Sequence, residues 1–186
     1  NIVDRDITST FEFPIAWFQS VNSVAILVIT PILTALWLFM SKRNFEPSIP
    51  LKFAFGLIGT GLGFAVLMYA LTHLVDDKSM IPFWTLVACY VLHTIGELCL
   101  SPVGLSMVSK LVPSSMAGLA FGGWFLSTAI GNNFSGILAG QMSGATGMSI
   151  ESAYDGFSFA FWLLLAGGGF LIVTAPLVNK LMHGVR

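Results

Sequence analysis

One carboxylate, Glu97, lies in the middle of a long apolar segment that extends from Ile81 to about Val112. The other acidic residues lie in polar stretches between apolar segments or near the start of the chain. A charged side chain at the centre of a membrane-spanning helix costs on the order of 3 kcal/mol, so it should face a water-filled cavity or a partner. The favoured chemistry is therefore capture of a cation or transfer of a proton. The alternative is a protonated carboxyl that is hydrogen-bonded between helices.

His93, Glu97 and Ser101 follow one another at intervals of four residues, which places them on one face of a helix. Ser101 can donate a hydrogen bond to the carboxylate, or it can bond back to the Glu97 carbonyl beside Pro102. His93 can relay a proton, although a lone intramembrane histidine is more often a packing residue. We predict Glu97 and His93 as the proton-relay candidates, and a bend or break of the helix at Ser101–Pro102.

A polar stripe runs along the first apolar segment, where Gln19, Asn22 and Ser23 share one helical face. Amides are costly in lipid unless they are hydrogen-bonded. The stripe should therefore face a cavity, or it should hold two helices together. We predict Gln19 and Asn22 as ligand-binding residues.

Trp124 lies in the fourth apolar segment, next to two glycines and on one face with Thr128, Asn132 and Ser135. An indole can line a pocket and donate one hydrogen bond. The alternative is placement at the membrane interface, where Trp is enriched. The sequence contains no metal-ligand cluster, phosphate-binding glycine loop or nucleophile–histidine–acid set. We expect no catalytic residues, metal, cofactor or enzymatic activity.

These residues must be positioned by membrane-spanning helices. The chain has 186 residues, of which 55% are hydrophobic and 9% charged, and its mean hydropathy is +0.85. Soluble domains carry about 25% charged residues. The composition argues against a soluble enzyme, a disordered chain and a nucleic-acid-binding protein. It predicts an all-α membrane protein, because helices satisfy their own backbone groups within lipid.

Five apolar segments are long enough to cross a bilayer, which takes roughly 20 residues. They follow an external loop at 1–13 and precede a cytoplasmic tail at 182–186, and Pro31 should kink the first. The fourth is the least hydrophobic. The predicted helices of this bundle, 14–181, cover approximately 14–40, 51–74, 81–112, 117–140 and 157–181.

The distribution of basic residues predicts the orientation of the bundle. With the first residues outside, Arg5 and Lys78 are external, and a larger set is internal: Lys42, Arg43, Lys52, Lys110, Lys180 and Arg186. We therefore expect a multi-pass protein of the cell membrane, which in a bacterium is the inner membrane. The start of the chain would lie outside and its end in the cytoplasm.

Three stretches resemble motifs of the proton-dependent oligopeptide transporter (POT) family, part of the major facilitator superfamily. They are Gly96–Ser106 (GELCLSPVGLS), Trp17–Asn22 (WFQSVN) and Gly123–Ser127 (GWFLS). The resemblance covers essentially the whole chain. It implies a fold of twelve helices in two halves, in which these five spans resemble the eighth to twelfth. The polar stretch before them resembles the external loop after the seventh helix.

The resemblance also implies roles for the candidate residues. Glu97 would pair with the amino terminus of a bound peptide, and Asn22 would hydrogen-bond the same end. Ser101 would lie beside Glu97 in the pocket, and Trp124 would form an aromatic wall. His93 is similar to a residue that is frequent at this place in the family, with no assigned role.

The same resemblance implies that this chain holds half of a binding site. The family's proton-coupling motif and its basic residues for the peptide carboxylate belong to the N-terminal half, which would be the partner. We expect part of a proton-coupled di/tripeptide symporter that works by alternating access, with no activity in this part alone. The alternatives are a POT relative that carries nitrate or a modified amino acid, and a non-transporting membrane receptor or scaffold.

Overall fold

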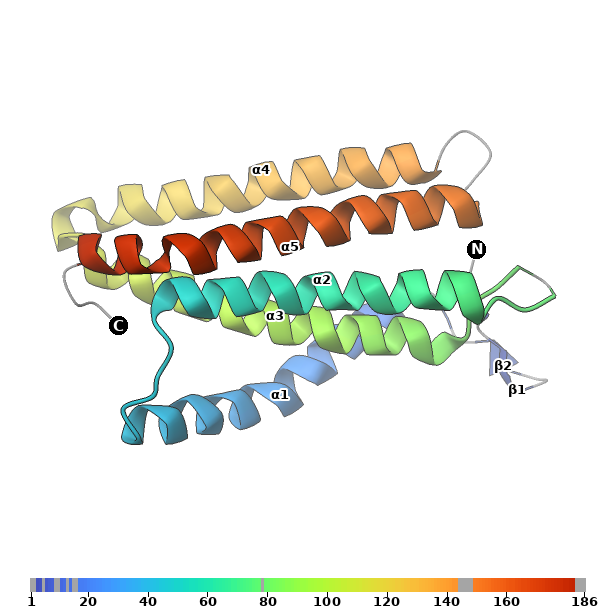
Figure 1. Cartoon of the computed structure of the whole chain (residues 1–186), viewed down its shortest axis with the longest axis horizontal. Coiled ribbons are helices and arrows are strands. Elements are labelled where there is room, and N and C mark those ends of the chain that lie inside the picture. The colour runs from blue at the N-terminus through green and yellow to red at the C-terminus, as the bar shows by residue number, and fades with distance from the viewer. Residues whose placement is uncertain are drawn as a thin grey trace.

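The protein folds into five long helices and a short hairpin (Figure 1). The structure, a computed structural model, describes residues 3–4, 6–8, 11–12, 14, 17–77, 79–143 and 149–182. The predicted all-α class is confirmed. The elements are β1 (Asp6–Thr8), β2 (Phe11–Glu12), α1 (Trp17–Lys42), α2 (Ile49–His73), α3 (Phe83–Leu111), a 3-10 turn at Ser114–Met116, α4 (Ala117–Ser143) and α5 (Ile150–Leu181).

Four of these helices, α1, α2, α3 and α5, are long and apolar enough to cross a membrane. The predicted fourth span, α4, is less apolar because glycines, Asn132 and Asn133 interrupt it. Its 27 residues make a helix about 40 Å long. Figure 1 shows that α4 follows α5 along its length. We therefore treat α4 as the fifth membrane helix.

The helix ends differ most from prediction between α4 and α5. The sequence predicts a loop from Gln141 to Gly156, but α4 continues to Ser143 and α5 begins at Ile150. Ser149 caps α5, because its hydroxyl accepts a hydrogen bond from the Ser152 amide and the Ser152 hydroxyl accepts one from the Ser149 amide. The apolar pattern missed this first turn because its residues are polar.

The sequence predicts a bend or a break at Ser101–Pro102, and the break is wrong, because α3 passes through Pro102 without interruption. Proline removes only one backbone donor, and tight packing of α3 against α2 keeps the helix continuous on both sides. α1 is also continuous through Pro31. Figure 1 shows that the two ends of α1 run in different directions, as expected of a helix with an internal proline.

The most extensive packing joins α2 to α3 on one side and to α5 on the other. Glycines allow these close approaches. A Cβ on Gly96 of α3 would lie 2.6 Å from the Gly56 carbonyl oxygen of α2, and a Cβ on Gly168 of α5 would lie 2.7 Å from an Ile58 side-chain carbon. By contrast, α1 packs chiefly against α3, and α4 makes limited contacts with α3 and α5.

A small apolar core closes one end of this three-helix unit. Leu67 and Leu71 of α2 pack there with Cys89 of α3 and with Ile81, which is 1% exposed in the turn between them. The start of the chain joins this core through a parallel bridge between Val3 and Ile81. The two segments on either side of α1 and α2 are thereby tied together.

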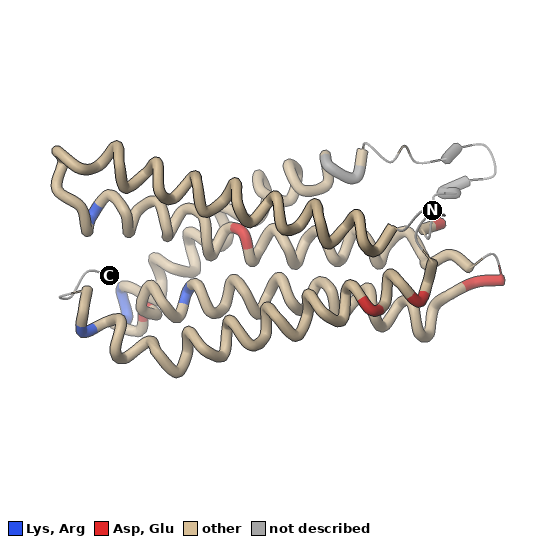
Figure 2. Tube along the Cα trace, turned by 90° about the horizontal axis from the view of Figure 1, so that it is seen from above, with Lys and Arg blue, Asp and Glu red and all other residues tan. Residues whose placement is uncertain are grey.

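Charged residues are segregated along the bundle (Figure 2). Lys and Arg gather at one end, Asp and Glu mostly at the other, and one acidic position lies between them. At the basic end, Lys52 of α2 forms an ion pair with Glu46 of the α1–α2 loop. Hydrogen bonds from Lys52 and Ser41 hold the pKa of Glu46 below its usual value, against the opposing effect of burial. This pairing attaches the loop to α2.

The glycine contact between α2 and α3 predicts a stability effect. Gly96→Ala places a methyl group against the Gly56 carbonyl and the Thr60 side chain, so the unfolding free energy should fall by about 1–3 kcal/mol. The measurement is the thermal unfolding midpoint of the purified protein in detergent. Gly169→Ala in α5 is the matched control, since a Cβ there meets nothing within 4 Å. Equal midpoints for the two variants would contradict this packing.

Candidate functional site

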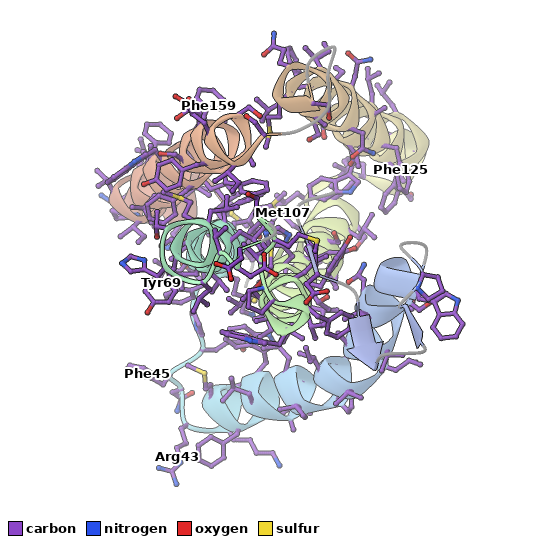
Figure 3. The ribbon with its side chains drawn as sticks, turned by 90° about the vertical axis from the view of Figure 1, so that its right-hand side faces the viewer. Arg43, Phe45, Tyr69, Met107, Phe125 and Phe159 are labelled. Atoms are coloured by element: carbon purple, nitrogen blue, oxygen red, sulfur yellow. The ribbon has the colours of Figure 1, made fainter. Side chains whose placement is uncertain are left out.

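Glu97 lies at the midpoint of α3, and its side chain is exposed in the bundle. The neighbouring residues Gly96 and Cys99 are buried, so α3 turns its small residues toward α2 and its carboxylate away from that contact. Viewed from the end, α1 and α4 lie on opposite sides of α3 (Figure 3). Among the described residues, no ion pair involves Glu97. The carboxylate is therefore available to an external partner.

Asn22 of α1 reaches α3 one turn before Glu97. The Thr94 hydroxyl lies 2.5 Å from the side-chain oxygen of Asn22 and 2.8 Å from the Tyr90 carbonyl oxygen. Thr94 is fully buried, whereas Asn22 is partly exposed. Residues three apart on a helix have their Cβ atoms about 5–6 Å apart, so this contact holds the Asn22 amide beside Glu97.

Trp124 of α4 approaches α3 on the other side of Glu97. Its indole occupies the space that a side chain at Gly104 would fill, and its ring lies edge-on to Phe53 of α2, with centroids 6.3 Å apart. Ser101, which is exposed, lies between Glu97 and Gly104 along α3. Gly104 thus leaves room for the indole against α3, and the edge-on contact with Phe53 keeps the ring there.

The predicted residues consequently meet along one stripe of α3. Thr94, Glu97, Ser101 and Gly104 are spaced by three, four and three residues, which keeps them on one side of the helix. Asn22 joins the stripe at Thr94, and Trp124 joins it at Gly104. Sequence reasoning missed Thr94 and Gly104. Gly104 belongs to the GELCLSPVGLS motif, but the sequence gives no sign that its missing side chain makes room for Trp124.

His93 faces α2 instead of this stripe. Its ring packs against Phe64, with centroids 4.7 Å apart, and its Nε2 lies 3.6 Å from the Cys89 Sγ on the same helix. A Cβ on Gly63 would lie 2.5 Å from the imidazole, so glycine is needed where α2 passes the ring. These contacts favour a packing role for the His93 imidazole. Its role as a proton relay stays a prediction.

Other predicted polar residues occupy exposed positions. Ser23 of α1 and Asn132 and Ser135 of α4 are exposed, and Thr128 bonds to the Trp124 carbonyl of its own helix. The side chain of Gln19 lies outside the described residues, so its role stays a prediction. No group of His, Cys, Asp and Glu that could hold a metal ion occurs in the part of the chain that the structure describes.

In the part of the chain that the structure describes, two hollows flank α3, and Glu97 lines neither of them. One, of about 660 Å³, lies between α1 and α3 and is apolar, with Val24 and Val91 in its lining. The other, of about 500 Å³, is lined by α2, α3, α4 and α5 and includes His93 and Phe157. Glu97 and Ser101 are instead exposed on their own face of α3.

Comparison with known proteins gives consistent matches. The family model described as the POT family matches residues 1–154. The chain is 32% identical over 178 residues to a protein named peptide transporter YePEPT of Yersinia enterocolitica, covering 95% of this chain and 34% of the relative. It is 30% identical to dipeptide and tripeptide permease B of Aliivibrio fischeri, covering 88% of this chain and 34% of that protein.

A solved structure matches over nearly the same range. It is a crystal structure of a mutant of the peptide transporter POT in complex with alafosfalin, with a TM-score of 0.83, 31% identity and coverage of 97% of this chain and 35% of that one. The chain therefore spans about a third of the length of the proteins it matches. The helical architecture agrees with this match. The chain belongs to the POT family.

Proposed function

We propose that this chain is the C-terminal part of a proton-coupled symporter for dipeptides and tripeptides, and that it forms one wall of the peptide pocket. The observation that carries the proposal is an exposed carboxylate at the midpoint of α3, free of ion pairs within the described residues. An amide from α1 lies one turn away. Relatives named for peptide transport support the substrate class. The function is transport, and catalysis has no place in it.

The physical basis of recognition is the pairing of opposite charges away from bulk water. A carboxylate at this depth is costly without a partner, and the ammonium group of a peptide supplies one. Glu97 and His93 are the candidates for the proton relay, and symport requires that the proton and the peptide cross the membrane together.

Transport requires a second wall. In alternating access, two halves of the protein rock about a central site, and each exposes the site to one side of the membrane in turn. α1 and α4 flank the stripe on α3 that carries Glu97. The N-terminal half of the same transporter would close this face and supply the basic partner for the peptide carboxylate.

We place the protein in the cell membrane with its basic end in the cytoplasm. Support comes from five cations at that end of the bundle, while Arg5, Lys78 and Arg186 lie outside the described residues. The cations are Lys42, Arg43, Lys52, Lys110 and Lys180. The loop at 1–13 would then be external and the tail at 182–186 cytoplasmic. A bacterial host would use its inner membrane.

Neutralising Glu97 should strongly reduce peptide uptake. We expect the full-length protein in liposomes to take up labelled dialanine when a proton gradient is directed inward. Glu97→Gln should reduce that uptake by about tenfold to a hundredfold, because a hydrogen bond to a charged group contributes about 1.5–3 kcal/mol. Glu151→Gln, in the first turn of α5, is the matched control and should leave uptake unchanged.

The possible outcomes test the role of Glu97 and the identity of the substrate separately. Strong uptake by both variants would keep a peptide transporter and reject Glu97 as its anchor. A lack of dialanine uptake by the unmodified protein would reject the peptide assignment and favour another small solute, which a competition panel would then identify.

We also assign Trp124 as the aromatic wall of the pocket. Gly104→Ala forces a methyl group into the indole, so Trp124 must move off α3. The half-saturating concentration of dialanine should rise several-fold, because an aromatic contact contributes about 0.5–1.5 kcal/mol. Gly122→Ala in α4 is the control, since a Cβ there meets nothing within 4 Å. Unchanged half-saturation in Gly104→Ala would remove Trp124 from the pocket.

A further inference from the structure

We propose that Thr94 is a positioning residue that fixes the orientation of the Asn22 amide and so presents the amide oxygen to the cationic end of the substrate. The inference rests on the proposed function. It starts from the contact between α1 and α3, where the Thr94 hydroxyl lies within hydrogen-bond distance of Asn22.

The Thr94 hydroxyl contacts more acceptors than it has protons to donate. The Thr94 oxygen lies 2.8 Å from the Tyr90 carbonyl and 2.5 Å from the Asn22 side-chain oxygen. Both are acceptors, whereas a threonine hydroxyl has one proton to donate. The Thr94 hydroxyl can therefore donate to only one of these oxygens. At the other contact, two oxygens would face each other with no proton between them. Thr94 is 0% exposed, so water has no access to relieve that contact.

A half-turn of the Asn22 amide satisfies every group. The oxygen and nitrogen of an amide exchange places on that rotation, and their shapes are nearly the same. Thr94 then donates to the Tyr90 carbonyl and accepts a hydrogen bond from the Asn22 amide nitrogen. The Asn22 oxygen is left facing away from Thr94, and Asn22 is partly exposed.

This orientation suits a cationic ligand. Glu97 lies three residues after Thr94, so its carboxylate and the outward amide oxygen of Asn22 are neighbouring acceptors. An ammonium group has three donors and no acceptor. The opposite orientation would turn an amide N–H toward the ammonium and would repel it. Thr94 therefore favours a free amino terminus without contacting it.

The test uses two substitutions of Thr94 in the full-length protein in liposomes. Thr94→Val has nearly the same shape and lacks the hydroxyl, whereas Thr94→Ser keeps it. We expect the half-saturating concentration of dialanine to rise about tenfold in Thr94→Val, with its maximal rate retained, and to stay near the unmodified value in Thr94→Ser. Adding Thr94→Val to Asn22→Ala should cause no further rise, because the two residues act as one unit.

A second readout separates positioning from stability. N-acetyl-dialanine lacks the ammonium group, so it should compete with dialanine only weakly. Its inhibition constant should be the same in Thr94→Val as in the unmodified protein. If the valine variant is not recovered folded, Thr94→Cys replaces it, because a thiol is only a weak acceptor.

Three results would overturn the inference. In the first, Thr94→Val lowers the thermal midpoint and the maximal rate but leaves half-saturation unchanged, as a packing residue would. In the second, Asn22→Ala raises the half-saturating concentration of dialanine, whereas neither Thr94→Val nor Thr94→Cys does. That result would keep the proposed function and reject only the role of Thr94. In the third, the unmodified protein takes up no dialanine, which would reject the proposed function and this inference together.

Discussion

A single ionisable group at the middle of a membrane helix constrains the whole arrangement. Lipid offers Glu97 no hydrogen bonds, so the helix that carries it must turn it toward protein or water. α3 does so by directing Gly96 and Cys99 inward and leaving Glu97 on the opposite, open side. The same constraint explains why polar groups from α1 and α4 gather along that side. Large apolar side chains cover much of the remaining exposed surface, with Phe125 and Phe159 pointing outward (Figure 3).

The bundle combines a tightly packed part with two more loosely attached helices. α2 holds α3 and α5 through glycine contacts, which gives Glu97 a fixed position. α1 and α4 make fewer contacts, and each is joined to α3 at one chemically specific point. For α1 that point is the hydrogen bond between Asn22 and Thr94, and for α4 it is the indole of Trp124 over Gly104. A pocket whose walls can adjust around a fixed charge is suited to substrates that share an ammonium group and differ in their side chains.

The sequence was sufficient for the class, the number of helices and the position of Glu97, because each follows from composition and from the cost of a charge in lipid. It failed at the start of α5, where a polar capping turn precedes the apolar run. The break that it allowed at Pro102 is absent, because packing against α2 outweighs the preference of the local sequence. Thr94 and Gly104 could not be found, since their importance comes from which neighbouring helix contacts them. The spacing of His93 and Glu97 predicted a shared face, but only packing decides that the imidazole turns toward α2.

The central claim, that Glu97 faces water at the depth of the bilayer centre, is tested most directly by chemical accessibility. In a full-length protein lacking Cys89 and Cys99, Glu97→Cys would be exposed to a membrane-impermeant, cationic thiol reagent. Leu62→Cys is the matched control, because Leu62 lies near the middle of α2 and is 47% exposed on an apolar surface. We predict rapid modification at position 97 and none at position 62, with both reacting with a lipid-soluble maleimide. Equal resistance of the two positions to the cationic reagent would show that Glu97 does not face water and would contradict the account.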